Sequence, residues 1–367
     1  MQIRFLAYSD IHHDRCAARC IELEDTIEIE RQVHQRVIDG DFDFSIFCGD
    51  RFLRREPEDE VKVKADRALL QVLQGRQVPH YHLVGNHDWT KNNREWHTSE
   101  SIKYLGQNMT VLDKCGSYES RKYVIHALPA DMPFSMDDYC PVTDKFNLFV
   151  FHGIVKGSLI ADSSERVFED GINIAQIDQA AWNFVLGGDI HVPQTIPFRN
   201  TKGGYLGSVL QRTRADADKQ RGWLEVTATQ DLKSQGKWDV KADFVPTRNF
   251  FHKETWRIEP DTRFEDLKIN MDYISNQAVE VKLLGDKADV DRIADDKRWA
   301  NFQEFEQAKT IEVVRDYKAE QSESVIDLST SSNIFDDLTL YLDSGFAKIG
   351  NLSRDKIFEV VQKVREV

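Results

Sequence analysis

The sequence has few cysteines and no long hydrophobic run, and both absences restrict its class. Its 367 residues include 5 cysteines, an odd number with no Cys-x-x-Cys pair. We therefore expect reduced, packed thiols rather than a disulfide framework or a structural zinc site. No apolar stretch approaches the roughly 20 residues that a membrane-spanning helix needs. The N-terminal residues lack the pattern of a signal peptide, so we expect a cytoplasmic protein with no membrane attachment.

An excess of basic residues is also absent. The chain carries 48 Lys and Arg residues against 62 Asp and Glu residues, a net charge of −14. This balance argues against a protein that coats nucleic acid by bulk electrostatics. It still allows nucleic acid to be held through metal ions and a local Lys/Arg patch. Apolar residues make up 41% of the chain, enough for one large domain and a smaller one.

The sequence does contain a series of short polar signatures, each at the end of an apolar run. The runs predict strands over residues 3–8, 42–48, 80–84, 146–151 and 183–186. The signatures are Ser9-Asp10-Ile11-His12, Gly49-Asp50, Gly85-Asn86-His87-Asp88, Phe151-His152-Gly153 and Gly188-Asp189-Ile190-His191. Carboxylate, imidazole and amide groups together are the ligand set of a two-metal hydrolase. Two cations about 3.5–4 Å apart activate a water and hold the oxygens of a phosphoryl group.

Helical spacing separates the first strands along the chain. Apolar residues recur at helical intervals over 17–38 and 61–74. Strand–helix alternation predicts a mainly parallel α/β sheet, in which ligands bind at the carboxyl ends of the strands. The signatures should therefore converge there. Apolar runs at 205–209 and 222–227 predict two further strands, which we expect to be antiparallel.

A second, smaller domain is expected after residues 245–260, a stretch with two prolines that we interpret as a boundary. Beyond it the pattern predicts a strand, a helix and a strand at 279–284, 289–299 and 310–314. A polar linker follows, and the apolar spacing of the tail from Asn333 predicts two short amphipathic helices. The predicted domains are a first domain over 1–248, a smaller one over 249–320, and a linker with a tail over 321–367.

The order of the signatures resembles the calcineurin-like metallophosphoesterases and, within them, the SbcD-type exonucleases of double-strand-break repair. Tyr205-Leu206-Gly207-Ser208 and Arg221-Gly222-Trp223 are similar to two further elements of that family. The resemblance covers residues 1–245 and rests on layout alone beyond them. It implies a metallophosphoesterase β-sandwich flanked by helices as the nuclease domain over 1–248. It also implies a smaller α+β capping or DNA-binding domain over 249–320 and a partner-binding tail over 321–367. It also implies a manganese-dependent DNA exonuclease and endonuclease acting in repair or recombination.

The resemblance also implies a role for each signature residue. One metal is assigned to Asp10, His12, Asp50 and His191, and the other to Asp50, Asn86, His152 and Asp189, with Asp50 bridging. His87 is assigned the proton donor to the leaving oxygen. The residue types agree with these roles, because His87 directly follows a ligand and is free for proton transfer. Mixed oxygen and imidazole ligands suit two Mn²⁺ ions, with Mg²⁺ as the alternative.

Two positions depart from the family. Its last signature has histidine where this chain has Asp189, which either ligates the second metal with an added negative charge or lies behind the ligands. We favour ligation. Arg51 stands where the family more often has an apolar residue, and it either reaches a substrate phosphate or is solvated. Asp88, His13 and Asp14 adjoin ligands and either orient them or act as capping or solvated residues.

The resemblance further implies an SMC-like coiled-coil ATPase partner of the SbcC type and a homodimer. The tail either docks that ATPase or packs on its own domain. Part of the predicted dimer surface is residues 94–105, with Trp96, Ile102, Tyr104 and Leu105. Loop cations that steer DNA or simply form a charged surface are Arg54, Arg55, Lys91 and Arg94. Two alternatives stay open: a metallophosphoesterase acting on nucleotides or phosphoproteins, and a non-catalytic scaffold with a disabled metal site.

Overall fold

The computed structural model describes most of the chain up to Tyr317. The described residues are 1–18, 21–73, 78–90, 95–160, 167–217, 219–231, 237–267, 277–299, 308–317, 348–349 and 352–353. The chain forms two compact units, Met1–Tyr317 and Lys318–Val367. In the second unit only β18 (Lys348–Ile349) and β19 (Leu352–Ser353) are described. The predicted linker, the tail helices, Lys91 and Arg94 lie outside the described residues.

The first sheet has the strand order β14-β13-β1-β4-β5-β6. Its strands are β1 (Gln2–Tyr8), β4 (Phe44–Phe47), β5 (His80–Leu83), β6 (Met109–Leu112), β13 (Gly222–Asp231) and β14 (Lys237–Pro246). The strands β1, β4, β5 and β6 are parallel, as strand–helix alternation predicted. β13 pairs antiparallel with β1, with Gln2 opposite Thr229. The carboxyl ends of four neighbouring strands therefore share one edge.

The second sheet has the order β11-β12-β10-β9-β8-β7. Its strands are β7 (Gly116–Glu119), β8 (Tyr123–Leu128), β9 (Phe146–His152), β10 (Phe184–Gly188), β11 (Gln194–Thr195) and β12 (Gly203–Tyr205). β8, β9, β10 and β12 are parallel. The strand predicted at 205–209 is wrong in its bounds: β12 ends at Tyr205, and Gly207, with φ of 74°, turns the chain away. β12 pairs parallel with β10 and antiparallel with β11.

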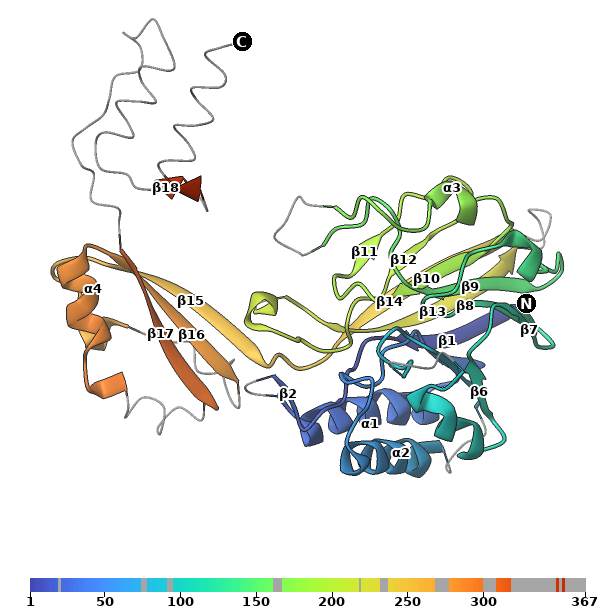
Figure 1. The fold of residues 1–367 in the computed structure, drawn as a ribbon, viewed down its shortest axis with the longest axis horizontal. Coiled ribbons are helices and arrows are strands. Elements are labelled where there is room, and N and C mark those ends of the chain that lie inside the picture. The colour runs from blue at the N-terminus through green and yellow to red at the C-terminus, as the bar shows by residue number, and fades with distance from the viewer. Residues whose placement is uncertain are drawn as a thin grey trace, which may run out of the picture. The chain divides into compact units, whose positions relative to one another are not determined.

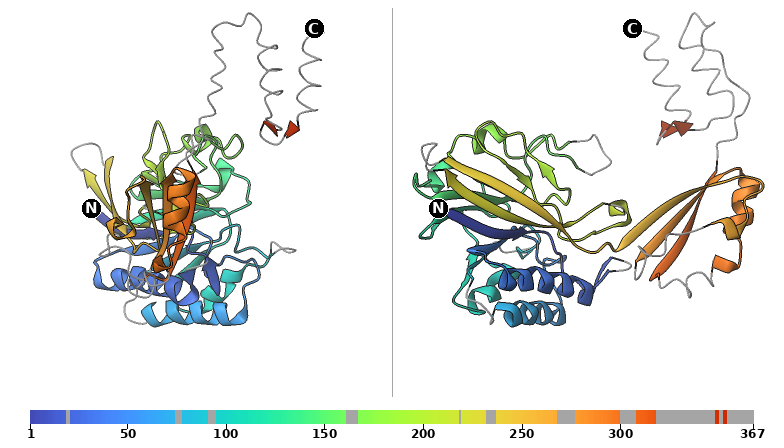
Figure 2. Two further views of the ribbon diagram at one scale, coloured as in Figure 1. Left: turned by 90° about the vertical axis from the view of Figure 1, so that its left-hand side faces the viewer. Right: turned by 180° about the vertical axis from the view of Figure 1, so that it is seen from behind.

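The two sheets face each other across an apolar core. Phe5, Phe44 and Phe146 are fully buried in it, and the rings of Phe5 and Phe44 stack with centroids 4.7 Å apart. Burying each such side chain contributes roughly 1.5–3 kcal/mol, so this layer holds the sandwich together. Figures 1 and 2 show the sheets layered, with α1 and α2 together on the side of the first sheet. The predicted α/β sandwich with flanking helices is confirmed.

Helices α1 (Leu23–Asp39) and α2 (Asp59–Leu73) bury one face each. Ile29, Val33 and Val37 recur four residues apart on α1 and pack with Phe47 of the sheet. This spacing places them on one stripe of the helix. The remaining short elements are β2 (Cys16–Ala18), β3 (Ile21–Glu22), α3 (Ile174–Ile177), η1 (Thr98–Tyr104), η2 (Met136–Asp138), η3 (Arg214–Asp216) and η4 (Phe264–Asp266). Among the described residues, no helix is long and apolar enough to cross a membrane.

A third, three-stranded parallel sheet follows the sandwich in sequence. It consists of β15 (Phe251–Ile258), β16 (Ala278–Gly285) and β17 (Thr310–Tyr317), with helix α4 (Lys287–Ala294). It has its own apolar cluster around Val281, Leu283 and Val290. The sequence predicted two of these strands and the helix but missed β15, because its flanking prolines were interpreted as a boundary. A domain division at residue 248 stays a prediction, since Met1–Tyr317 is one compact unit.

Candidate metal centre

Every polar signature lies at the carboxyl end of a strand of the sandwich. Asp10 and His12 follow β1, Asp50 follows β4, and Asn86 follows β5. In the facing sheet, His152 ends β9, and Asp189 and His191 follow β10. Because β1, β4 and β5 are neighbours in one sheet and β9 and β10 in the other, their ends meet at the same edge of the sandwich. The predicted convergence of these residues is present in the fold.

The backbone adopts an unusual conformation at four of these residues. Asp10, His12, Asp50 and Asp189 have φ of 54°, 50°, 62° and 89°. Residues other than glycine rarely adopt the left-handed region, and such strain tends to cluster at functional sites. The fold therefore holds the backbone of these four residues in costly conformations where their side chains meet.

Glycines allow the signatures to approach one another closely. A Cβ on Gly85 would lie 2.2 Å from Oδ1 of Asp50, and one on Gly188 would lie 2.1 Å from the carbonyl oxygen of Cys48. Both distances are far below van der Waals contact. Only glycine permits the loops after β4, β5 and β10 to come this close.

A first group of side chains lies around His12. Its Nε2 is 3.0 Å from Nε2 of His191 and 3.9 Å from Oδ1 of Asp10, which is also 3.9 Å from Nε2 of His191. Burial lowers the pKa of His12, and burial together with Arg212 lowers the pKa of His191 to about 4. Both rings are therefore neutral at pH 7, which is the form that binds metal ions.

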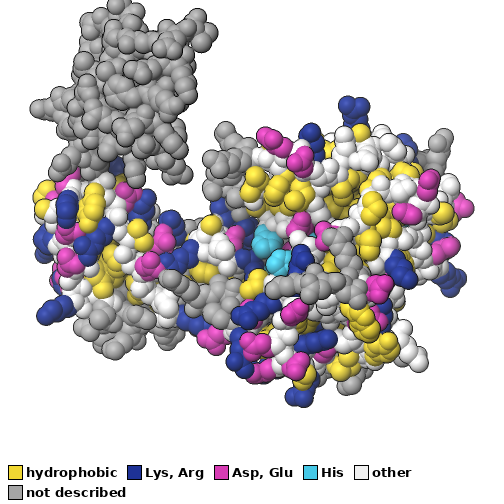
Figure 3. All heavy atoms as spheres, viewed as in Figure 1, with side chains coloured by type: hydrophobic (Ala, Val, Ile, Leu, Met, Phe, Trp, Pro, Cys, Tyr) yellow, Lys and Arg dark blue, Asp and Glu magenta, His cyan; other side chains and the backbone are white. Residues whose placement is uncertain are grey.

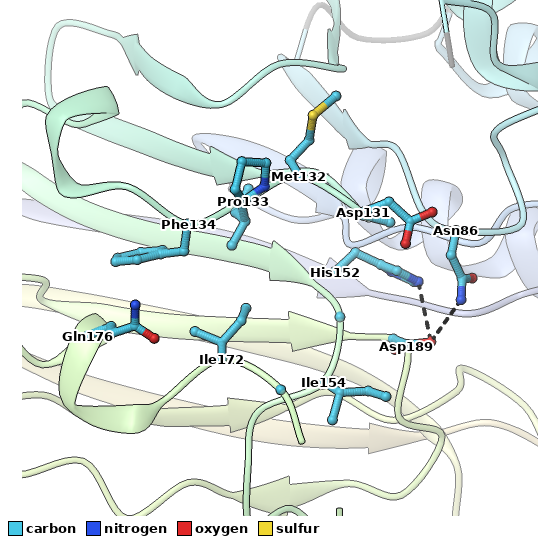
Figure 4. A pocket seen from close by; sticks show the side chains of 14 residues that line it. Asn86, Asp131, Met132, Pro133, Phe134, His152, Ile154, Ile172, Gln176 and Asp189 are labelled. Carbon is cyan, nitrogen blue, oxygen red and sulfur yellow. Dashed lines mark hydrogen bonds and ion pairs between the residues drawn. The ribbon is translucent and has the colours of Figure 1, made fainter. Parts of the chain in front are cut away.

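A second group lies around His152. Its Nε2 is 3.3 Å from Oδ1 of Asp50 and 3.9 Å from Oδ1 of Asp189. The amide of Asn86 donates from Nδ2 to Oδ1 of Asp189 at 3.3 Å (Figure 4). The other oxygen of Asp50 is 3.6 Å from Nε2 of His12, so Asp50 joins the two groups.

Buried atoms without partners show that this cluster fits cations. Oδ1 of Asn86 and Nε2 of His152 are buried and make no hydrogen bond, although Nε2 of His152 lies 3.3 Å from Oδ1 of Asp50. Burial, countered in part by His152 and increased by Asp50, raises the pKa of Asp10 to about 8. Gathering carboxylates in a buried site is costly unless positive charge is added. Divalent cations would supply that charge and use the unpartnered Asn86 and His152 atoms.

His87 is fixed beside the cluster by its own backbone and ring. Its backbone N–H donates to Oδ1 of Asp50 at 2.9 Å. Its Nδ1 lies 2.6 Å from the carbonyl oxygen of Leu53, which can only accept, so Nδ1 carries a proton. The ring centroid is 5.1 Å from that of His12. Nε2 is thus the nitrogen left to exchange a proton with a bound molecule.

Asp88 ties two of the signature loops together. Its carboxylate accepts from the backbone N–H of Gly85 at 2.9 Å, of Asp50 at 3.1 Å and of Arg51 at 3.2 Å. The side chain is fully buried. The sequence left two interpretations of Asp88 open. The structure supports the one in which Asp88 orients neighbouring ligands, because its carboxylate positions the backbone around Asp50.

Arg51 does not face a substrate or the solvent. It is 0% exposed, its Nη1 donates to Asp66 at 2.6 Å, and its Nε is 3.4 Å from Glu30. Both interpretations of Arg51 from the sequence are therefore corrected. His13 shares this buried network, with Nε2 3.0 Å from Glu30. The reason is that residues after the left-handed Asp50 turn back towards α1 and α2.

Replacing Arg51 by methionine should lower the free energy of unfolding by about 3–5 kcal/mol, because it leaves a buried carboxylate without its cation. Urea unfolding at pH 7 measures this loss. The double variant Arg51→Met with Glu30→Gln should lose less, since the unpaired charge is also removed. Equal losses in the single and double variants would contradict the ion-pair explanation.

The same pair should make stability depend on pH. Burial alone would raise the pKa of Glu30, but Arg51 and His13 outweigh it and hold that pKa well below its usual value. A lowered carboxyl pKa stabilises the folded state above the unfolded value of about 4.3. This contribution is lost as the pH falls through the folded pKa, so the gap between wild type and Arg51→Met should narrow in acid.

Arg212 was missed by the sequence analysis. It is 6% exposed, and its Nη1 donates to the carbonyl oxygen of Ile11 at 3.1 Å, between Asp10 and His12. Burial, against the attraction of Asp10, lowers its pKa to about 10. The only sequence signal was its place shortly after Tyr205-Leu206-Gly207-Ser208, which does not indicate a contact with the loop after β1. Arg212 places a positive charge beside the first group.

The surface around the cluster is a hollow in which histidine side chains are visible, with Lys and Arg side chains close by (Figure 3). Arg54, 57% exposed, bonds Asp14 beside this region. The net negative charge of the chain therefore coexists with local cations near the site. Two six-stranded sheets with carboxylates, imidazoles and an amide at their shared edge define the metal-dependent phosphoesterase class.

Comparisons with known proteins agree with this class. The profile of the family described as calcineurin-like phosphoesterase matches residues 3–208. That is more than half of the 367 residues, and the chain belongs to this family. It is also similar to the DNA double-strand break repair protein Mre11 of Haloferax volcanii, with 26% identity over 231 residues. This match covers 62% of the chain and 48% of the relative, so the chain spans about half the relative's length.

Two solved structures are also similar. One is a dimetal phosphatase from Danio rerio, with 10% identity, a TM-score of 0.42, and coverage of 66% of this chain and 98% of that one. The other is a predicted phosphoesterase from Streptococcus pneumoniae, with 13% identity, a TM-score of 0.31, and coverage of 66% and 90%.

Proposed function

We propose that this metallophosphoesterase is a DNA nuclease that hydrolyses phosphodiester bonds during DNA end processing. The single observation that carries the proposal is the convergence of the signature residues into one buried cluster. The similarity to the Mre11 protein supports DNA as the substrate. The exposed cations near the cluster support a polyanionic substrate, despite the net charge of −14.

Two divalent cations fit the two groups of side chains. Asp10, His12, Asp50 and His191 would hold one, and Asp50, Asn86, His152 and Asp189 the other. When bound, such cations activate a water and stabilise the charge of the phosphoryl group. Oxygen and neutral imidazole ligands, without a thiolate, favour Mn²⁺ or Mg²⁺. Asp189 takes the place of the family's histidine, because its Oδ1 lies beside both His152 and Asn86.

The chain's own residues supply the remaining chemistry. His87, held through Nδ1 by Leu53, presents Nε2 to the leaving oxygen and donates its proton. Arg212, beside the first group, adds a fixed positive charge for the phosphate. Asp88 holds the loop after β4 against the loop after β5 through its hydrogen bonds to backbone N–H groups. Together, His87 would act as the general acid and Arg212 would stabilise the negative charge of the phosphodiester electrostatically.

The proposed assembly includes a second copy of the chain and an SMC-like ATPase. Trp96 and Tyr104 are 60% and 81% exposed, which supports the predicted dimer surface around η1. Ile102 is fully buried and belongs to the core and not to that surface, whereas Leu105 is half-buried against the same apolar cluster. Of the tail proposed to bind the ATPase, only β18 and β19 are among the described residues.

The decisive test is hydrolysis by the purified chain with MnCl₂, MgCl₂ or EDTA. We expect manganese to raise the melting temperature and linear, end-labelled duplex DNA to be shortened in its presence. Hydrolysis of a chromogenic phosphodiester or a phosphopeptide without any DNA cleavage would favour the alternative substrates. If calorimetry detects no metal binding, the result would favour the alternative of a non-catalytic scaffold with a disabled metal site.

A further inference from the structure

The last strand of the first sheet, β14, is long and has one edge outside the sheet. It pairs with β13 along its whole length of 10 residues, from Lys237 opposite Asp231 to Pro246 opposite Gly222. Its other edge pairs with no strand among the described residues, because β14 ends the sheet. Edge strands present unpaired backbone N–H and C=O groups, and strands of about 5–6 residues are usual. β14 therefore offers an unusually long edge to a further strand.

The usual protections of an edge strand are missing from β14. Its pairing with β13 continues without a bulge, and its one proline, Pro246, is its last residue. The ring of Trp238 packs edge to face on Phe146 of the core, with centroids 5.2 Å apart, so Trp238 defines the inner face. Since side chains alternate along a strand, the inner face consists of Trp238, Val240, Ala242 and Phe244, and none of these is charged. Bulges, prolines and inward charges are what normally block such an edge.

The inner face of β14 borders an apolar cavity. The cavity has a volume of about 500 Å³ and lies between β14 and the strands β11 and β12 of the second sheet. Val240 and Ala242 line it from β14, and Ile196 and Phe198 line it from the chain that joins β11 to β12. Ala242 is exposed, and Phe244 further along the strand is 38% exposed. Another strand at this edge would cover apolar area that one copy of the chain leaves in water.

The outer face of β14 carries charges of both signs in alternation. Lys237, Asp239, Lys241 and Asp243 are all exposed, and Nζ of Lys241 lies 2.8 Å from Oδ2 of Asp243. Residues directly opposite each other in an antiparallel pair stabilise it when their charges are opposite and destabilise it when they are alike. The charge pattern therefore states which strand fits this edge.

A second copy of β14 fits this pattern when Val240 lies opposite itself. Lys237 then faces Asp243 of the second copy and Asp239 faces Lys241, so all four charges on each strand meet an opposite charge. On the inner face, the small Ala242 faces the large Trp238 of the second copy. Placing Lys241 opposite itself instead would make Asp239 face Asp243, which brings like charges together. The strand is thus complementary to itself in one register.

We propose that β14 pairs antiparallel with β14 of a second copy of the chain, with Val240 on the two-fold axis. The contact uses the same surface on both copies and joins their first sheets into one. Backbone hydrogen bonds supply most of the affinity, and the charges select the register, because exposed ion pairs contribute little by themselves. This surface differs from the one proposed around η1, since η1 packs beside β6 at the opposite edge of the sheet. The inference does not depend on the nuclease function.

The test is a disulfide placed on the proposed axis. Residues directly opposite in antiparallel strands have Cα atoms about 4.5–5.5 Å apart, which a disulfide can span. The full chain with Val240→Cys should therefore form a disulfide-linked dimer under mild oxidation. Ala242→Cys should not, because residue 242 does not face itself. The wild type is oxidised in parallel, since its own cysteines include the exposed Cys140.

Charge reversal on the outer face tests the register. Lys237→Asp with Lys241→Asp makes this face wholly acidic, and Asp239→Lys with Asp243→Lys makes it wholly basic. Added to Val240→Cys, each pair of substitutions should reduce the cross-linked dimer at least about 10-fold, because every opposite-charge pair becomes a like-charge pair. An equimolar mixture of the acidic and basic variants should recover the cross-link.

Lys114→Asp with Lys297→Asp is the matched control, because it makes the same change in net charge at two exposed lysines outside β14. It should cross-link as fully as Val240→Cys alone, and melting temperatures show whether each variant folds. Folded Val240→Cys protein that cross-links no more than the wild type overturns the inference, as do charge variants that cross-link undiminished. If Val240→Cys does not fold, sedimentation velocity of the two charge variants decides: a mixture heavier than either alone supports the pairing, and equal masses overturn it.

Discussion

Replacing His87 by glutamine is expected to lower the rate of DNA cleavage by roughly 10²–10⁴-fold, the usual contribution of a general acid. The ring is held beside Asp50 and His12 with Nδ1 bonded to the carbonyl oxygen of Leu53, so Nε2 is the group that is lost. Metal binding should persist, because the other carboxylate, imidazole and amide groups remain. Single-turnover cleavage and calorimetry with MnCl₂ measure the two effects.

A comparison of leaving groups separates a proton donor from a metal ligand. A 4-nitrophenolate leaves without a proton, so His87→Gln should impair a 4-nitrophenyl phosphodiester much less than DNA. His87 also lies within ligating distance of Asp50 and His12, and loss of a ligand would impair both substrates alike. His252→Gln is the control, since His252 lies on β15 in the third sheet and should behave as wild type in both assays.

Replacing Asp50 by asparagine is expected to remove both cations and nearly all hydrolysis. Asp50 contacts both groups, with one oxygen 3.6 Å from His12 and the other 3.3 Å from His152. Residues that only support metal ligands contribute 10–100-fold to affinity, so a shared ligand should contribute more than about 100-fold. Metal analysis of the dialysed protein and the melting-temperature increase with Mn²⁺ measure the loss.

Asp189→Ala is the matched variant for Asp50→Asn. The side chain of Asp189 contacts Asn86 and His152 of the second group, and its contact with Asp10 is made by the backbone N–H, which the substitution keeps. This variant should therefore retain one cation and part of the Mn²⁺-induced increase in melting temperature. Asp189→His should restore the second cation, because it returns the residue typical of the family. An Asp189→Ala protein that still binds two cations would place Asp189 behind the ligands, the alternative that the sequence left open.

The sequence was sufficient to predict the sandwich and the convergence of the signature residues at one edge of it. Each apolar run stops at a polar residue, and parallel strands bring such ends to one edge whatever the details of packing. β15 was missed, because two prolines at its flanks outweighed its alternating pattern. The direction of β12 depends on its pairing with β10, a long-range contact that local pattern does not encode.

The sequence-based interpretation of Arg51 was wrong, and its buried network with His13 and the contact of Arg212 were not predicted, for physical reasons. In the left-handed turns at Asp10, His12 and Asp50, alternation no longer says which way the next side chain points. Arg51 and His13 therefore turn inward to Glu30, although their positions beside ligands favoured a role in the site. Arg212 reaches Ile11 from a segment some 200 residues later, and no spacing rule predicts such a contact.

The antiparallel pairing of β13 with β1 has a practical consequence. Gln2 lies opposite Thr229, so the paired residues Asp231 and Lys237 lie near the start of β1, whereas the signature residues follow its end. Seven residues of strand separate the two places, about 20 Å at 3.3 Å per residue. A fluorophore attached at Asp231 or Lys237 would therefore leave the space at the metal centre free.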